Sequence, residues 1–184
     1  MRDKINFLIQ GVKNFKEVGT ITRSGPTLCK KMIASVPADQ DMVIVELGAG
    51  DGVITHHLLK KLTPGSKVIS IELNPKLWEQ LNSIDDPKLI AINDTMENLK
   101  PILEEQGIDQ IDQIISAIPF ALFPKEEIKG FLDNHKSLIK PGGKYIQLHY
   151  GPNLFNFYKD IFGIGKLHFV LSNVPPAFVM EFDA

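Results

Sequence analysis

The chain has 184 residues, of which 43% are hydrophobic and 23% charged, a composition that fits one globular domain with a sizeable core. It contains no run of 18 apolar residues and no secretory signal at its amino terminus, so we expect neither a membrane-spanning helix nor export. A single cysteine, Cys29, excludes an internal disulfide, and no cysteine and histidine spacing typical of zinc is present. We therefore expect a cytoplasmic protein that needs no metal.

Residues 1–40 are predicted to form helices that lead into the rest of the domain, and their charge is uneven. Residues 1–31 hold seven basic and two acidic residues, a net charge of +5, whereas the whole chain carries −2. Apolar side chains recur at helical spacing at Ile5, Leu8, Val12 and Phe15. A basic amphipathic helix can lie on an anionic membrane surface, and the same stripe can equally pack on the core, so both interpretations stay open.

From residue 41 onward, apolar runs alternate with helical patterns, which is typical of βαβ units. Strands are predicted at residues 42–47, 67–73, 88–94, 111–118 and 142–150. Helices are predicted between them at residues 52–62, 74–84, 95–107 and 125–139. Pro101 is expected to break the third of these helices.

The carboxyl-terminal part of the chain changes this rhythm. The aromatic-rich residues 153–169 predict either a core helix or a lipid contact. Two further strands, within residues 166–174 and 177–183, are joined by too short a link to be parallel. We predict one α/β domain, residues 1–184, in which residues 41–184 form a Rossmann-like, seven-stranded, mostly parallel sheet with an antiparallel last strand and helices on both faces.

The first predicted strand ends in the glycine-rich sequence VELGAGDGV, residues 45–53. Gly48, Gly50 and Gly52 permit a tight turn from strand to helix that a ligand can approach closely. Val53 stands where a dinucleotide-binding turn has glycine or alanine, and Glu46 suits a cationic group better than a pyrophosphate. Such a turn can also serve only to pack a helix on a strand.

Three carboxylates fall at the ends of three consecutive predicted strands. Glu46 precedes the glycine turn, Glu72 lies where a ribose diol could bind, and Asp94 lies where an adenine amine could be recognised. Each of them alone could be a solvated or helix-capping acid. Together they fit a ligand with an ammonium group, a ribose and an adenine, which predicts S-adenosylmethionine.

At these positions the chain resembles the class I S-adenosylmethionine-dependent methyltransferases. VELGAGDG resembles their first motif, IELN (residues 71–74) their second acidic motif, and NDTMENL (residues 93–99) their adenine-side motif. The resemblance implies an enzyme that binds S-adenosylmethionine through an amino-terminal segment and the ends of the strands. The implied cofactor-binding residues are Gly19, Thr20, Glu46, Gly48, Gly50, Glu72, Asp94, Thr95, Ser116 and Ala117.

The fourth predicted strand leads into the apolar stretch ISAIPFALFP, residues 115–124. Methyltransferases of nucleic-acid amines keep an asparagine or aspartate here, followed by proline and an aromatic residue, whereas this chain reads Ala117-Ile118-Pro119-Phe120. The group that would hold a planar base is therefore absent. We expect a strand end beside the reacting methyl group, with Pro119 and Phe120 in contact with the substrate; plain core packing is the alternative.

Four segments resemble the bacterial phospholipid N-methyltransferases that act on phosphatidylethanolamine: residues 7–32, 116–124, 141–152 and 173–182. YIQLHYGP resembles that family's Gln-x-x-Tyr-Gly-Pro signature, and NVPPA its Asn-x-Pro-Pro-Ala. Ribosomal RNA adenine dimethylases are more distant in layout, because they add a helical domain and are usually basic. The resemblance implies an amino phospholipid as acceptor. The basic amino terminus suits peripheral contact with an anionic membrane surface at the inner face, and the acidic remainder of the chain argues against a nucleic-acid partner.

The residues at the end of the fifth predicted strand are candidates for handling the acceptor amine. Tyr150, within the family-like signature, is expected to hydrogen-bond the amine, and His149 is the alternative as a base. Because side chains alternate along a strand, only one of the two should face the site. An RNA or small-molecule methyltransferase, and a binding protein without turnover, remain alternatives on the same fold.

Overall fold

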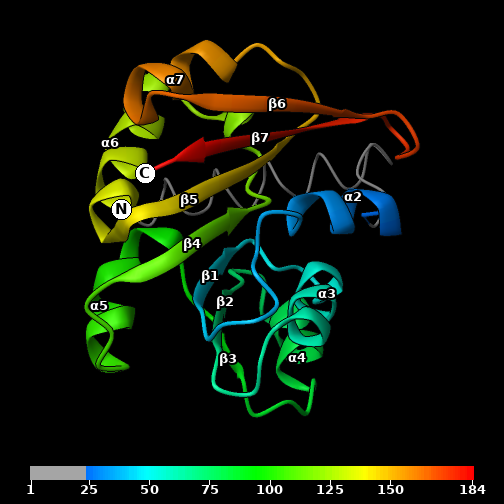
Figure 1. The fold of residues 1–184 in the computed structure, drawn as a ribbon, viewed down its shortest axis with the longest axis vertical. Helices are drawn as coiled ribbons and strands as arrows, with labels where there is room; N and C mark the ends of the chain where they lie inside the picture. The colour runs from blue at the N-terminus through cyan, green and yellow to red at the C-terminus, as the bar shows by residue number, and fades with distance from the viewer. Residues whose placement is uncertain (1–23) are drawn as a thin grey trace.

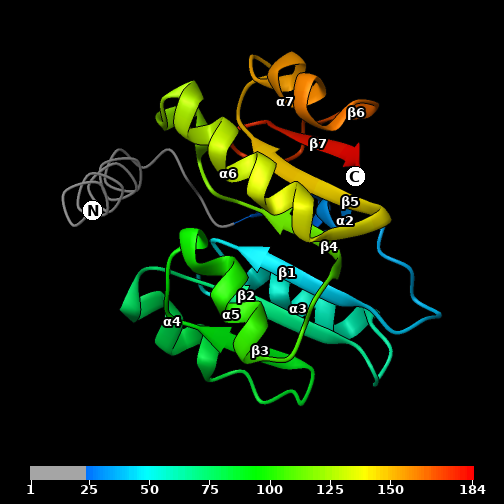
Figure 2. The same ribbon diagram turned by 90° about the vertical axis from the view of Figure 1, so that its left-hand side faces the viewer.

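The computed structural model describes residues 24–184, and the expectations for Gly19, Thr20 and the amino-terminal apolar stripe lie outside this part of the chain. Within it, seven strands form one sheet in the order β3-β2-β1-β4-β5-β7-β6. Helices cover both faces of the sheet (Figures 1 and 2). This is the Rossmann-like architecture that the sequence predicts.

The strands are β1 (Val43–Leu47), β2 (Lys67–Ile71), β3 (Leu89–Ile92), β4 (Ile111–Ser116), β5 (Ile139–His149), β6 (Gly165–Val170) and β7 (Ala177–Asp183). The helices are α2 (Pro26–Met32), α3 (Val53–Lys61), α4 (Pro75–Asn82), α5 (Leu99–Glu105), α6 (Lys125–Leu138) and α7 (Phe155–Phe162), with short 3-10 turns η1 (Met96–Asn98) and η2 (Phe120–Leu122). Strands β1 to β5 pair in parallel. Strand β7 runs antiparallel to both β5 and β6, which confirms the predicted antiparallel last strand.

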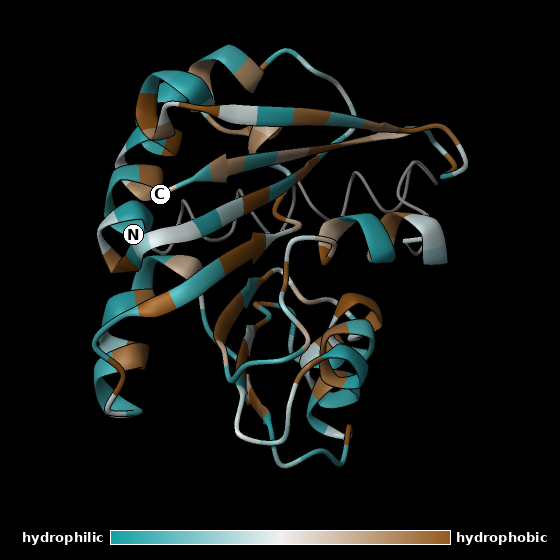
Figure 3. Ribbon diagram, in the orientation of Figure 1, coloured by the Kyte–Doolittle hydropathy of each residue, from teal (hydrophilic) through white to brown (hydrophobic). Residues whose placement is uncertain are grey.

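Two apolar clusters, one on each face of the sheet, hold the helices in place. On one face, α5, α6 and α7 bury side chains such as Leu103, Leu132 and Tyr158 against the strands. On the other face, α2 and α3 bury Met32 and Leu58. In Figure 3, hydrophobic colours cover much of β1 and the end of β4, while the other strands and the helices show mixed colours. Burial on both faces is why the central strands read as continuous apolar runs.

The structure differs from the sequence prediction at Pro101, and it decides between the two interpretations of the aromatic-rich segment. Pro101 does not break its helix, because α5 begins at Leu99 and Pro101 lies in the first turn, where a missing N–H costs no helical hydrogen bond. Helix α7 packs on the sheet with Tyr158 and Phe162 buried, which favours the core-helix interpretation of this segment.

Candidate active site

The carboxyl ends of β1 to β4 meet at one edge of the sheet, and the glycine turn after β1 lies there. Gly48, Gly50 and Gly52 have φ angles of 71°, 62° and 84°, a region that favours glycine. A Cβ added to Gly52 would lie 2.7 Å from the end of the Ile84 side chain, so Ile84 would have to move in addition to the backbone strain at this φ. A Cβ added to Gly50 would meet no non-neighbouring atom of the described chain within 4 Å, which leaves room for a ligand.

Glu72 follows β2 and ties that strand to the glycine turn. Its Oε2 accepts a hydrogen bond from the Gly50 N–H at 2.8 Å, and its Oε1 accepts one from the Asn74 N–H at 2.8 Å. The Asn93 side-chain amide donates to the Glu72 carbonyl at 2.8 Å and so links β2 to the end of β3. Each carboxylate oxygen can accept a second hydrogen bond, so Glu72 can receive the two hydroxyls of a diol beside Gly50.

Glu46, near the end of β1, is enclosed between β1, β2 and α3 and is 1% exposed. Its Oε2 accepts hydrogen bonds from the Thr55 hydroxyl at 2.6 Å and the Ser70 hydroxyl at 2.7 Å. Its Oε1 is buried with no hydrogen-bond partner among the described residues. Burial raises the pKa of this carboxyl to about 7, against the lowering effect of the two hydroxyls and with a further rise from the charge of Glu72.

Asp94 and Thr95 follow β3. Asp94 Oδ1 accepts hydrogen bonds from the Thr95 N–H at 2.6 Å and from the Asn98 side-chain amide at 2.9 Å. These two hydrogen bonds fix the orientation of the carboxylate at the end of β3, although it does not cap η1, whose N-cap is Thr95. Recognition of an adenine amine by Asp94 stays a prediction.

The β4–α6 loop, residues 117–124, lies against the glycine turn. The Ala117 N–H donates to the Leu47 carbonyl at 2.9 Å, and a Cβ added to Gly48 would come within 3.2 Å of the Ile118 side chain. Ala117, Ile118 and Pro119 are half-buried. This part of the loop presents neither a charged nor an amide side chain, so its surface at the edge of the sheet is apolar.

The same loop turns into the core after Pro119. Phe120 is fully buried, with its ring centroid 5.5 Å from that of Phe123 and 6.4 Å from that of Phe131. Ser116, just before the loop, is also fully buried, and its hydroxyl accepts a hydrogen bond from the Ile118 N–H at 3.3 Å. Strand β4 therefore ends at Ser116, residues 117–119 are half-buried at this end of the sheet, and Phe120 packs beneath the surface. Contact of Pro119 with a substrate stays a prediction, and the burial of Phe120 disfavours such a contact for that residue.

Gln147 on β5 holds the β4–α6 loop in place, a role that the sequence analysis did not assign. It is fully buried, and its Nε2 donates to the Ile118 carbonyl at 2.9 Å and to the Leu148 carbonyl at 2.9 Å. Its Oε1 accepts a hydrogen bond from the Tyr145 hydroxyl at 3.2 Å. The signal in the sequence is a polar amide inside an otherwise apolar strand.

His149 and Tyr150 point to opposite faces of the sheet, as the alternation predicts. His149 is buried, with Nε2 lying 3.3 Å from the Tyr158 hydroxyl of α7, and burial lowers its pKa to about 4. Tyr150 is half-buried and packs against the α2 and α3 cluster, and burial raises its pKa. His149 is therefore a neutral core residue at pH 7, while Tyr150 keeps part of its surface exposed.

Comparison with known proteins then decides the family. Residues 44–143, more than half of the chain, match the family model described as a methyltransferase domain. The chain belongs to the methyltransferase domain family. It is a class I methyltransferase, an enzyme with S-adenosylmethionine as its cofactor. Among the described residues, no cluster of histidine, cysteine or acidic side chains could hold a metal ion, and no helix could span a bilayer.

Two curated proteins and one solved structure illustrate the similarity of this methyltransferase. An ornithine lipid N-methyltransferase of Singulisphaera acidiphila is 28% identical over 180 residues, 96% of this chain and 94% of that protein. Ribosomal RNA small subunit methyltransferase A of Thermotoga petrophila is 28% identical over 116 residues, 61% of this chain and 40% of that protein. The 1,6-didemethyltoxoflavin-N1-methyltransferase of Burkholderia thailandensis shares the fold, with a TM-score of 0.70 at 14% identity over 97% of this chain and 86% of that one.

The residues at the edge of the sheet fit the cofactor of this methyltransferase. Gly50 leaves open space at the turn, the Glu72 carboxylate has acceptor positions for a diol, and Glu46 keeps one buried oxygen without a hydrogen-bond partner among the described residues. We propose that Glu72 binds the ribose, that Asp94 and Thr95 lie at the adenine, and that the glycine turn and Glu46 hold the amino-acid end.

Proposed function

We propose that this methyltransferase acts on the amine of an amino lipid, such as phosphatidylethanolamine or an ornithine lipid. The observation that carries the proposal is the apolar surface of the β4–α6 loop, formed by Ala117, Ile118 and Pro119 beside the glycine turn. A planar base needs a hydrogen-bonding clamp at this place, whereas a tetrahedral amine does not. The similarity to an ornithine lipid N-methyltransferase over nearly the full length of both chains supports the same acceptor class.

For methyl transfer, the protein has to position the acceptor amine and favour the amine over its protonated form. The cofactor supplies an electrophilic methyl group on a sulfonium, and an amine can attack it only when its lone pair is free. Apolar surroundings such as Ile118 and Pro119 favour the neutral amine over the ammonium ion. The raised pKa of Tyr150 keeps its hydroxyl protonated, so its oxygen can accept a hydrogen bond from the amine and orient it, rather than act as an anionic base.

The acceptor is tested by incubation of the purified protein with methyl-labelled S-adenosylmethionine and a panel of substrates. The panel holds vesicles with phosphatidylethanolamine, vesicles with ornithine lipid, and ribosomal RNA. We expect label in a lipid fraction and none in RNA, because the body of the chain is acidic and phosphate contacts supply much of the affinity of RNA enzymes. Label in RNA with every lipid untouched would refute the proposal.

In the same assay, Tyr150→Phe should lower lipid turnover by roughly tenfold to a hundredfold while cofactor affinity stays unchanged.

A second prediction concerns Gln147. Replacement by leucine removes the donor to the Ile118 carbonyl, so the β4–α6 loop should shift and turnover of the amino lipid should fall by roughly tenfold to a hundredfold. Cofactor affinity, measured by calorimetry, should change by less than about threefold, because Gln147 does not touch the glycine turn in any hydrogen bond of the described structure.

Gln113→Leu is the matched control, since Gln113 is also buried in the sheet and donates to the Ser35 carbonyl away from the β4–α6 loop. Each variant should lose about 1–3 kcal/mol of stability. If both variants lose turnover equally, Gln147 acts only through stability and not through the loop.

A further inference from the structure

The apolar side chains that the structure leaves exposed gather in one segment. In the described part of the chain, every large hydrophobic residue with an exposed side chain falls between positions 164 and 174: Ile164 (78% exposed), Leu167 (38%), Phe169 (56%), Leu171 (71%) and Val174 (72%). The segment comprises the edge strand β6 and the turn to β7, where Figure 3 shows hydrophobic residues at the outer corner. A concentration of exposed apolar surface of this kind marks an interaction site.

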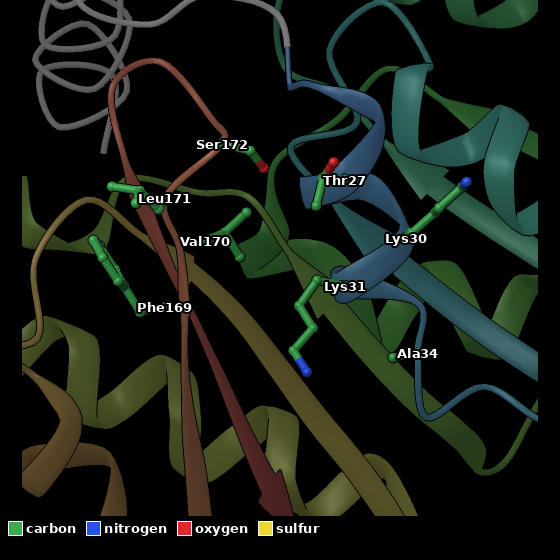
Figure 4. A pocket seen from close by; sticks show the side chains of 8 residues that line it. All are labelled: Thr27, Lys30, Lys31, Ala34, Phe169, Val170, Leu171 and Ser172. Atoms are coloured by element: carbon green, nitrogen blue, oxygen red, sulfur yellow. The ribbon is translucent and has the colours of Figure 1, made fainter.

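Lysines of α2 lie beside this segment. Lys30 and Lys31 share an open groove of about 490 Å³ with Phe169, Val170 and Leu171, and none of the described residues that line it is acidic. In Figure 4, Val170 projects toward α2, Phe169 lies on the opposite side of the strand, and the Lys31 side chain extends along the gap between helix and strand. The surface thus combines apolar side chains with positive charge on a chain whose net charge is negative.

This surface adjoins the edge of the sheet that carries the active site. Strands β5 and β6 both run antiparallel to β7, which lies between them, so β6 ends on the same side of the sheet as β5. Asn173 joins the β6–β7 turn to α2, because its Oδ1 accepts a hydrogen bond from the Gly25 N–H at 3.0 Å and its Nδ2 donates to the Pro175 carbonyl at 2.8 Å. Asn173 is 3% exposed. The turn and the start of α2 are therefore held together as one unit.

We propose that the β6–β7 turn and α2 form the surface on which the protein docks to an anionic lipid bilayer. Leu171, in the turn, enters the apolar interface, and Lys30 and Lys31 bind lipid phosphates. This inference rests on the proposed function, since docking here brings the acceptor edge of the sheet to the membrane surface. A second copy of the chain fits less well, because two-fold pairing through this surface would bring the lysines of both copies together.

The experiment is flotation of the full-length protein with vesicles of equal parts phosphatidylglycerol and phosphatidylcholine, which contain no amino lipid. Leu171→Ser and the double variant Lys30→Gln/Lys31→Gln should each reduce the vesicle partition coefficient by about tenfold or more at low salt. The matched controls are Ile164→Ser, at the opposite end of β6 and equally exposed, and Lys100→Gln/Lys129→Gln, on exposed positions of α5 and α6. The controls should bind as the wild type does.

The proposal is overturned if Leu171→Ser binds vesicles as tightly as the wild type, or if Leu171→Ser and its control Ile164→Ser weaken binding equally. It is also overturned if size-exclusion chromatography with light scattering shows a dimer that Leu171→Ser dissociates while vesicle binding is unchanged, since the surface would then join two copies. Because these vesicles lack an acceptor, the outcome is independent of turnover. Vesicle flotation therefore tests the docking surface, and the methyl-transfer assay separately tests the amino-lipid acceptor.

Discussion

Replacing Glu72 with alanine is expected to weaken S-adenosylmethionine binding by about a hundredfold or more. Both oxygens of this carboxylate have an acceptor position left after binding the N–H groups of Gly50 and Asn74, so the wild type can offer charged hydrogen bonds to two hydroxyls. A hydrogen bond to a charged group contributes roughly 1.5–3 kcal/mol, and two of them account for the expected loss of affinity. Titration calorimetry on both proteins measures the effect.

Two further variants provide a control and a graded test of this carboxylate. Glu79→Ala removes an exposed glutamate from α4 and should leave affinity unchanged. Glu72→Gln keeps one acceptor oxygen and should fall between the wild type and Glu72→Ala. An unchanged dissociation constant for Glu72→Ala would show that the ribose binds elsewhere.

The presence of strands β1 to β5 and their parallel direction could be predicted, because strands buried on both faces require continuous apolar runs, which alternate here with helical patterns. The position of β7 between β5 and β6 could not be read from any local pattern. The short link between the last two strands indicates only that these two strands are antiparallel to each other. The order depends on distant packing, in which Phe182 of β7 stacks with Tyr158 and Phe162 of α7.

The candidate site was partly predictable for a similar reason. Gly50 and Glu72 each follow the end of a strand, and the carboxyl ends of parallel strands lie on the same side of a sheet. The closeness of these two residues therefore follows from the fold class. The enclosure of Glu46 does not follow, because its partners Thr55 and Ser70 lie 9 and 24 residues away. Gln147 likewise holds the Ile118 carbonyl, 29 residues earlier in the chain. Contacts between residues this far apart are set by three-dimensional packing, and no spacing pattern in the sequence predicts them.

The enclosure of Glu46 makes stability depend on pH in a defined direction. In the folded protein its pKa is raised from the ordinary value of 4.5 to about 7, chiefly because burial disfavours the charged form. Below pH 4.5 the group is protonated in both states and has no effect. As the pH rises from 4.5 to about 7, the unfolded chain ionises first, so folding stability falls, and above this window the loss is constant.

The variant Glu46→Gln is expected to lack this contribution. Other titrating groups are common to both proteins, so the difference between the two free energies of unfolding isolates Glu46. Between pH 5 and pH 8 the wild type should lose about 2–3 kcal/mol relative to Glu46→Gln, measured by urea unfolding at several pH values. Ser70→Ala removes a hydroxyl that lowers the pKa of Glu46, so in that variant the loss should extend to higher pH. Parallel pH profiles for the wild type and Glu46→Gln would mean that Glu46 titrates as an ordinary carboxylate and that water reaches its unpaired oxygen.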